Sequence, residues 1–68
     1  MSLQRIVARN IKRLRREREL SQEELAGLAG PNRNYIGMVE RQENAPTVDT
    51  LEAIAKALQV DAVKLIEQ

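Results

Sequence analysis

One helix-start signal occurs four times along the chain, and it constrains the fold more than any other feature of the sequence. In each case a polar residue that can cap a helix follows an apolar residue or a proline, and an apolar residue stands four positions later. The four capping residues are Ser21, Asn32, Thr47 and Asp61. The apolar periodicity is helical throughout. We therefore predict an all-α fold with five helices, near residues 3–18, 22–29, 33–41, 48–58 and 62–67.

The first predicted helix is apolar on one side and basic on the other. Five basic residues fall opposite the apolar stripe: Arg5, Arg9, Lys12, Arg13 and Arg16. Asn10 lies inside the stripe, so we expect it to be hydrogen-bonded to backbone. Residues 1–20 contain seven basic and two acidic residues, whereas residues 21–68 contain four basic and eight acidic ones. A basic helix on an acidic body indicates a face that meets a polyanion, although a solvated amphipathic helix has the same pattern.

The residue types that are absent exclude several classes of protein. The sequence of 68 residues, expected to be a single domain (1–68), has no Cys and no His, so we predict no disulfide, no metal site and no cofactor. Glu23 and Glu24 are adjacent carboxylates, but at a helix start they suit the helix dipole rather than catalysis. We therefore predict that the protein is not an enzyme. No apolar run is long enough for a signal peptide or a membrane span, so we expect a cytoplasmic protein with no membrane partner.

A connection of three residues joins the second and third predicted helices. Gly30 is expected to take a positive φ, Pro31 stops the second helix, and Asn32 caps the third. So short a turn packs two helices at a steep angle, with the small Ala26 where they would cross. Residues 22–41 therefore predict a helix-turn-helix unit.

Three segments of the sequence resemble one known family. "LSQEELAGLAG", "NRNYIGMVER" and "PTVDTLEAIAKAL" are similar to the Cro/repressor-type (XRE) helix-turn-helix family, and the resemblance runs over residues 10–60. It implies a compact five-helix, lambda-repressor-like domain that binds double-stranded DNA and regulates transcription. Within the family the chain looks most like restriction–modification controllers and phage Cro-like repressors. It departs from the family at Glu19, Gln42 and Gln59, where glycine is usual, and in the loop "QENAP", where Lys or Arg is common. Glu19 and Gln59 stand where a predicted helix ends, so we expect left-handed backbone there, which favours glycine.

Residues at the start and on the outer side of the third helix are predicted to read DNA bases. They are Arg33, Asn34, Met38 and, besides its capping role, Asn32. Arg33 can grip a guanine edge, Asn34 an adenine edge, and Met38 a thymine methyl group. Gly37 is also expected to face outward, where it would let the helix approach the duplex closely. Each of these residues could instead be ordinary surface.

A second set of residues is predicted to hold the phosphate backbone: Gln22, Arg41, Lys12, Arg15 and Tyr35. The resemblance implies the role of Gln22, which begins a helix whose free N–H groups favour an anion. It also implies that Arg15 pairs with Glu40, so a structural role for Arg15 comes before phosphate contact. Arg41 and Lys12 could equally be solvated, and Tyr35 could be a packing residue with its hydroxyl at the surface.

The C-terminal helix, about residues 62–67, has more apolar residues than one side can bury. Val63, Leu65 and Ile66 are expected to form a homodimer interface. Two recognition helices would then lie about 34 Å apart and read a pseudo-palindromic operator. The main hypothesis is therefore a sequence-specific transcriptional regulator, most simply a repressor. The alternative is an antitoxin-type module that inhibits a protein partner; a non-specific architectural protein would need more Lys and Arg than this chain has.

Overall fold

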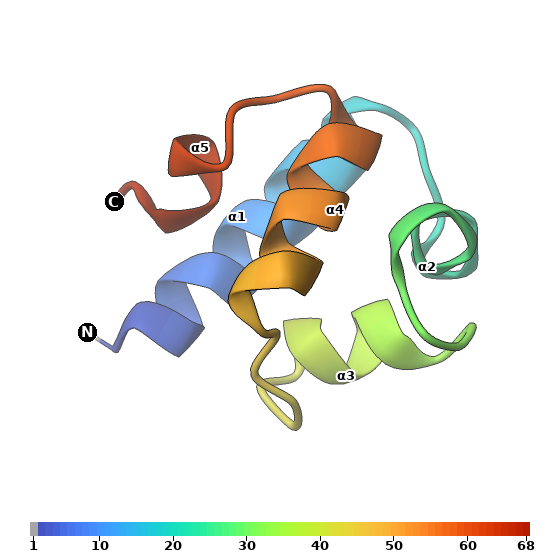
Figure 1. Cartoon of the computed structure of the whole chain (residues 1–68), viewed down its shortest axis with the longest axis horizontal. Coiled ribbons are helices and arrows are strands. Elements are labelled where there is room, and N and C mark those ends of the chain that lie inside the picture. The colour runs from blue at the N-terminus through green and yellow to red at the C-terminus, as the bar shows by residue number, and fades with distance from the viewer. Residues whose placement is uncertain (1) are drawn as a thin grey trace.

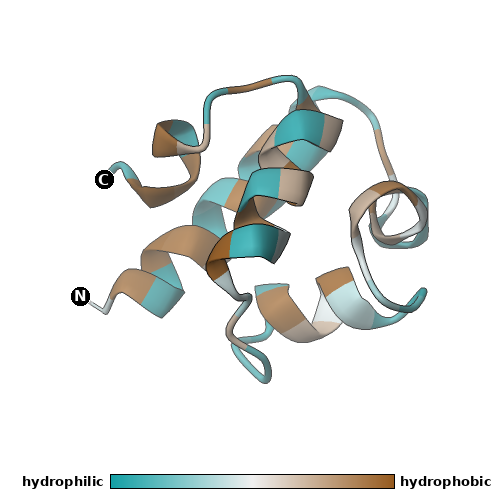
Figure 2. Cartoon of the chain, viewed as in Figure 1, coloured by the Kyte–Doolittle hydropathy of each residue, from teal (hydrophilic) through white to brown (hydrophobic). Residues whose placement is uncertain are grey.

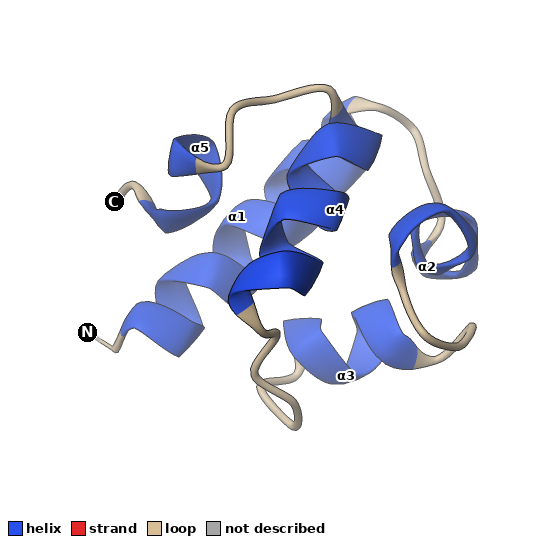
Figure 3. Ribbon diagram, viewed as in Figure 1, coloured by secondary structure: helices blue, strands red, loops and turns tan. Residues whose placement is uncertain are grey.

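Five helices make up the part of the chain that the computed structural model describes, residues 2–68, and no strand occurs in that range (Figures 1 and 3). They are α1 (Leu3–Glu17), α2 (Gln22–Ala29), α3 (Tyr35–Glu40), α4 (Val48–Leu58) and α5 (Val63–Ile66). The all-α prediction with five helices is confirmed. The first, second and fourth helices agree with prediction to within one residue, whereas α3 and α5 are shorter than predicted. Of the helices within residues 2–68, none is long and apolar enough to cross a membrane.

Two of the four predicted caps work as expected. The Ser21 hydroxyl accepts a hydrogen bond from the backbone N–H of Glu24, and the Glu24 carboxylate accepts one from the backbone N–H of Ser21, which completes a capping box at α2. The Thr47 hydroxyl caps α4 by accepting from the backbone N–H of Thr50. Ser2 caps α1 in the same way, through the N–H of Arg5, and this cap was not predicted.

The other two predicted capping residues instead form turns, and the helices after them begin later in the sequence than predicted. The Asn32 side chain accepts from the backbone N–H of Asn34 at 3.0 Å, and the Asp61 side chain accepts from that of Val63 at 3.0 Å. Each first turn is closed by a backbone bond over three residues instead of four, as from Tyr35 N–H to the Asn32 carbonyl. Hence α3 begins at Tyr35 and α5 at Val63, two residues and one residue later than predicted.

Three helices end in left-handed backbone without glycine. The φ angles are 56° at Glu19, 62° at Gln42 and 60° at Gln59, just past the ends of α1, α3 and α4. At each end, two backbone N–H groups bond to carbonyls of the last turn in the Schellman pattern, for example from Val60 to the carbonyl of Ala55 at 3.0 Å. The left-handed positions expected at Glu19 and Gln59 are confirmed.

Gly30, by contrast, does not take the positive φ that its place after α2 suggested. Its φ is −116° and its ψ is 161°, which is extended backbone that any residue can adopt. The constraint there is space, since a Cβ would lie 3.2 Å from the Ala26 carbonyl oxygen and 3.2 Å from two carbon atoms of Tyr35. Gly30 therefore lets α2 and α3 approach closely around the turn.

The core lies where the apolar sides of the five helices meet. Helix α2 packs against α3 and α4, and α1 packs against α3 and α5. The large side chains that are fully buried there include Ile11, Leu25, Ile36, Ile54, Leu58 and Leu65. Figure 2 shows hydrophilic and hydrophobic residues alternating around α1 and α4, as expected for helices with one buried side. Helix α3 is thereby held at the edge of the molecule in Figure 1.

Asn10 is a buried polar residue that joins the first helix to the C-terminal helix. It is 4% exposed, and its side-chain amide donates hydrogen bonds to the backbone carbonyls of Leu65 and Glu67, at 3.0 Å and 2.6 Å. Both amide hydrogens are therefore used, and the expected bonding of Asn10 to backbone is observed. The bonds fix the end of α5 against α1.

Candidate nucleic-acid interface

The turn before α3 exposes three consecutive polar side chains, Asn32, Arg33 and Asn34, which we call the reading turn. All three are exposed, and the turn leads directly into α3. The side-chain oxygen of Asn32 is used within the turn, by the N–H of Asn34. No intramolecular hydrogen bond or ion pair within residues 2–68 involves the side chains of Arg33 and Asn34. The turn therefore offers free donors and acceptors to an outside ligand, although Arg33 and Asn34 precede the helix instead of lying within it.

The inner side of α3 is fixed by Ile36 and Val39, which are 0% and 1% exposed. Met38 and Gly37 differ from the expectation that they face outward. Met38 is partly buried and packs against the core, so only part of its side chain remains at the surface. Gly37 is buried, because the side chains of Arg41 and Gln22 cover it. A Cβ at Gly37 would lie 2.9 Å from Nη1 of Arg41 and 3.1 Å from Oε1 of Gln22.

A hydrogen-bonded network joins α1, α2 and α3 behind this surface. Arg15 donates from Nε to Oε2 of Glu40 at 2.7 Å and from Nη2 to Oε1 at 3.2 Å, so the structure brings the expected pair together in a bidentate ion pair. Its Nη1 donates to the Leu20 carbonyl at 2.8 Å. The side chains of Arg15 and Glu40 are 10% and 4% exposed. With its donors directed at protein acceptors, Arg15 is a positioning residue for α3, and little of it can reach a phosphate.

Gln22 completes the network from the first position of α2. Its side-chain amide donates to Oε1 of Glu40 at 2.9 Å, so Glu40 accepts from residues on both neighbouring helices. The oxygen of the same amide lies beside Gly37. Gln22 is half-buried and sits where free backbone N–H groups begin α2, so it both braces α3 and borders a site that suits an anion.

Arg41 lies at the far end of α3 in an exposed ion pair. Its Nε and Nη2 donate to Glu43 at 3.0 Å and 3.2 Å, and both side chains are 55% exposed. The hydrogen bond from Arg41 lowers the pKa of the Glu43 carboxyl, and the same bond raises the pKa of Arg41. Glu43 was not among the predicted site residues, although opposite charges two positions apart in "ERQEN" are a signal that could have suggested the pair.

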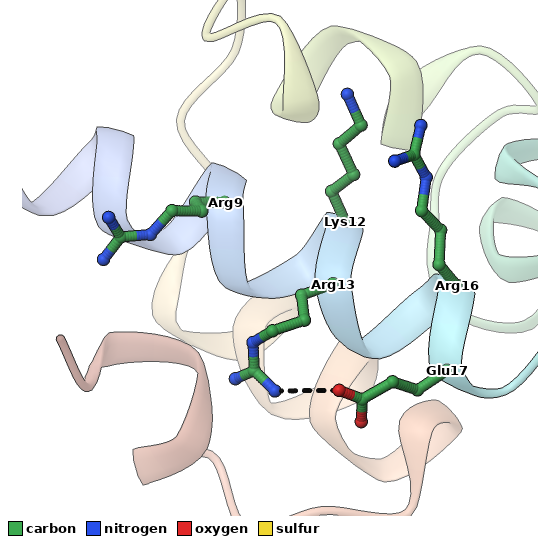
Figure 4. A pocket seen from close by; sticks show the side chains of 5 residues that line it. All are labelled: Arg9, Lys12, Arg13, Arg16 and Glu17. Carbon is green, nitrogen blue, oxygen red and sulfur yellow. Dashed lines mark hydrogen bonds and ion pairs between the residues drawn. The ribbon is translucent and has the colours of Figure 1, made fainter.

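Lys12 is exposed on the outer side of α1, among four basic side chains that line one open hollow (Figure 4). Tyr35 is only 6% exposed and packs in the core, which leaves little of it to contact a phosphate. Within residues 2–68, no group of three or more His, Cys, Asp or Glu side chains could hold a metal ion.

The three residues expected at a dimer interface are not all at the surface. Val63 and Ile66 are 52% and 44% exposed, but Leu65 is fully buried within the subunit. Position 65 points into the core because α5 is a single turn with one side against α1. An interface built on α5 would therefore use Val63 and Ile66 and not Leu65.

The chain is similar to known proteins along nearly all of its length. The family described as Helix-turn-helix (HTH_3) matches residues 11–65. The control protein C.SmaI of Serratia marcescens is 44% identical over 66 residues, which cover 97% of this chain and 79% of that protein. A solved structure of the hypothetical transcription factor NHTF from Neisseria has a TM-score of 0.92 at 35% identity, covering 97% of this chain and 76% of the other. The restriction-modification controller protein C.AhdI from Aeromonas hydrophila has a TM-score of 0.85 at 32% identity, covering 91% of this chain and 94% of the other.

Proposed function

This chain belongs to the helix-turn-helix family, and from that membership we propose that it regulates transcription as a homodimer that reads a pseudo-palindromic operator. Regulation of transcription by DNA binding is supported by the relatives, since the family and the similar controller proteins are DNA-binding regulators and not enzymes. The observation that supports sequence-specific reading of DNA is the reading turn. Within residues 2–68 its Arg33 and Asn34 side chains have no partner, and they stand at the start of a helix that is fixed to the core on its other side.

In the proposed complex, α3 enters the major groove with the reading turn in front. Arg33 contacts the O6 and N7 atoms of a guanine, and Asn34 the N6 and N7 atoms of an adenine. Asn32 can still offer its amide hydrogens to a base, because only its side-chain oxygen is used within the turn. The exposed part of Met38 contacts a thymine methyl group.

Phosphate contacts come from residues around this surface. Gln22 and the free N–H groups at the start of α2 hold one phosphate, and the Gln22 side chain simultaneously fixes α3 through Glu40. Lys12 and Arg41 supply further cationic contacts. To make its contact, Arg41 must break its ion pair with Glu43 and bind the phosphate in its place. These contacts position the protein on the duplex but carry no sequence information.

We assign the homodimer interface to α5. Val63 and Ile66 are three positions apart on one turn, and both remain more than two-fifths exposed, so a second copy could cover them. A twofold axis beside α5 would place the two reading turns on successive major grooves, about 34 Å apart.

Selection of binding sites from random duplex DNA tests this proposal. We expect an inverted repeat with half-sites about one helical turn apart. The Arg33→Ala variant should lose preference at one position of each half-site, by about 1–3 kcal/mol of discrimination. Lys12→Ala, the control, should weaken binding to all sequences alike. Absence of an enriched motif would overturn the proposed function, and an unchanged motif for Arg33→Ala would overturn the assignment of the base-reading residue.

A further inference from the structure

The outer side of α1 carries a cluster of cations that the reading turn and the α5 interface do not use. Four basic side chains and Glu17 line an open hollow of about 580 Å³: Arg9, Lys12, Arg13 and Arg16. They start from one face of the helix, since Arg9 and Lys12, and likewise Arg13 and Arg16, are three positions apart, but the ends of their side chains diverge (Figure 4). All are exposed, so the hollow is a surface and not an enclosed ligand cavity.

The cations of this cluster are not equivalent. Arg13 is paired within the helix, with its Nη1 3.2 Å from Oε2 of Glu17. Lys12 and Arg16 have no carboxylate within 4.0 Å among residues 2–68. In Figure 4 they extend together on the side of α1 where α3 lies, whereas Arg13 extends to the opposite side. Two like charges four positions apart destabilise a helix in the absence of a counter-ion, so the pair suits an anionic ligand.

The position of the pair along α1 relates it to the proposed complex. Asn10 marks where α5 contacts α1. Arg16 is six residues farther along, about 9 Å at the rise of an α-helix, and it precedes the start of α2 by only six positions. If the twofold axis lies beside α5, then Lys12 and Arg16 lie toward the outer end of each half-site.

We propose that Lys12 and Arg16 form a phosphate-binding pair that holds the DNA backbone just outside the base pairs read by the reading turn. This inference rests on the proposed function. It adds Arg16 to the phosphate-binding residues and says where on the DNA the pair binds. Four residues separate the two cations, about 6 Å along the helix axis, a spacing that lets the two side chains reach neighbouring phosphates of one strand. A guanidinium also binds a phosphate in bidentate fashion. The pair supplies cationic contacts that the loop before α4 lacks, since residues 42–46 contain no Lys or Arg.

The test uses the full chain and two duplexes that carry the selected operator. One duplex ends at the last selected base pair, and the other extends about ten base pairs beyond it on each side, which is about one helical turn. The variants are Arg16→Gln and Lys12→Gln/Arg16→Gln. The matched control is Arg13→Gln, which removes the same charge from the same helix at a position already paired with Glu17. Helical content and thermal unfolding of each variant report whether the fold is kept.

For the double variant we expect affinity for the extended duplex to fall at least tenfold at 0.1 M salt. Because each subunit of the proposed dimer loses two phosphate contacts, the salt slope should decrease by about four. The short duplex should change much less, and Arg13→Gln should change neither duplex by more than about twofold. An equal loss on both duplexes would overturn the flanking location, and no loss on either would overturn the site. In both cases the unmodified protein would still bind the short duplex, whereas failure of that binding would reject the proposed function instead.

Discussion

Replacing Glu40 with Gln tests whether the network behind α3 holds the fold together. The substitution keeps the size of the side chain but removes the charge that Arg15 faces from 2.7 Å. Removing one member of a buried ion pair costs about 3–5 kcal/mol, because the other charge stays buried without its partner. Since Arg15 keeps its bond to the Leu20 carbonyl, we expect the low end, about 3 kcal/mol. That is a large share of the total stability of a 68-residue domain, which is on the order of 3–10 kcal/mol.

Urea unfolding followed by circular dichroism measures the loss. With a denaturant slope of about 1 kcal/mol per molar urea, the midpoint should fall by about 3 M. The matched control is Glu17→Gln, which breaks an ion pair with similar chemistry between side chains that are 52% and 53% exposed. That pair should be worth only about 0.2–0.5 kcal/mol. Arg15→Met/Glu40→Leu, which removes both charges, should recover most of the stability.

Comparing Glu40→Gln with Glu17→Gln shows whether burial of the ion pair, and not the mere contact of two opposite charges, causes the loss of stability. If Glu40→Gln destabilises the protein no more than Glu17→Gln does, then burial does not make the Arg15–Glu40 pair important, and the role given to Arg15 fails. A variant that is unfolded before urea is added would agree with the expectation, provided that Arg15→Met/Glu40→Leu folds.

Three further perturbations follow from particular contacts. Gln59→Gly should stabilise the protein by about 1 kcal/mol, because it relieves a left-handed residue at φ 60°; a thermal midpoint no higher than that of the parent would contradict this. Glu24→Gln should flatten the loss of stability that occurs as pH falls below about 4.5. Hydrogen bonds from the Ser21 backbone N–H, and secondarily the Ser21 hydroxyl, lower the pKa of the Glu24 carboxyl in the folded state below its ordinary value of 4.5. The ionised carboxylate therefore stabilises the fold fully above pH 4.5, and this stabilisation is lost as pH falls through the lowered pKa. The free energy of unfolding is measured as a function of pH for the parent protein, for Glu24→Gln and for the control Glu23→Gln. Curves for Glu24→Gln and the parent that stay parallel would refute the prediction. Gly37→Ala should displace the ends of the Arg41 and Gln22 side chains and so weaken operator binding, while stability stays the same or rises by up to about 1 kcal/mol; unchanged affinity would mean that neither side chain needs its present position.

Local hydrogen-bonding chemistry was the most predictable part of the fold. Ser21 and Thr47 cap their helices as expected, because a capping hydroxyl depends only on residues two or three positions away. The left-handed ends at Glu19 and Gln59 were also predictable, since the helices before them have clear periodicity. The length of α3 was not, because Asn32 can cap a helix or close a turn, and the sequence does not decide between the two.

The surroundings of the candidate site were less predictable, because they depend on side chains from other helices. A helical wheel turns Gly37 and Met38 outward, but it contains neither the Gln22 side chain of α2 nor the core that packs against Met38. Gly30 was assigned a backbone role, whereas its constraint is a contact with Tyr35 that forms only when α2 and α3 pack. The positions of Arg33 and Asn34 at an exposed edge were predictable, because they follow from the order of the elements.

The two hydrogen bonds of Asn10 make the proposed dimer depend on a residue that no partner can touch. A helix of four residues such as α5 has no stability of its own in water. The surface formed by Val63 and Ile66 therefore keeps its shape only while α1 holds the end of α5. The concentration at which two chains associate, and with it the amount of protein needed to occupy an operator, can then be altered from inside the subunit while the reading turn stays unchanged.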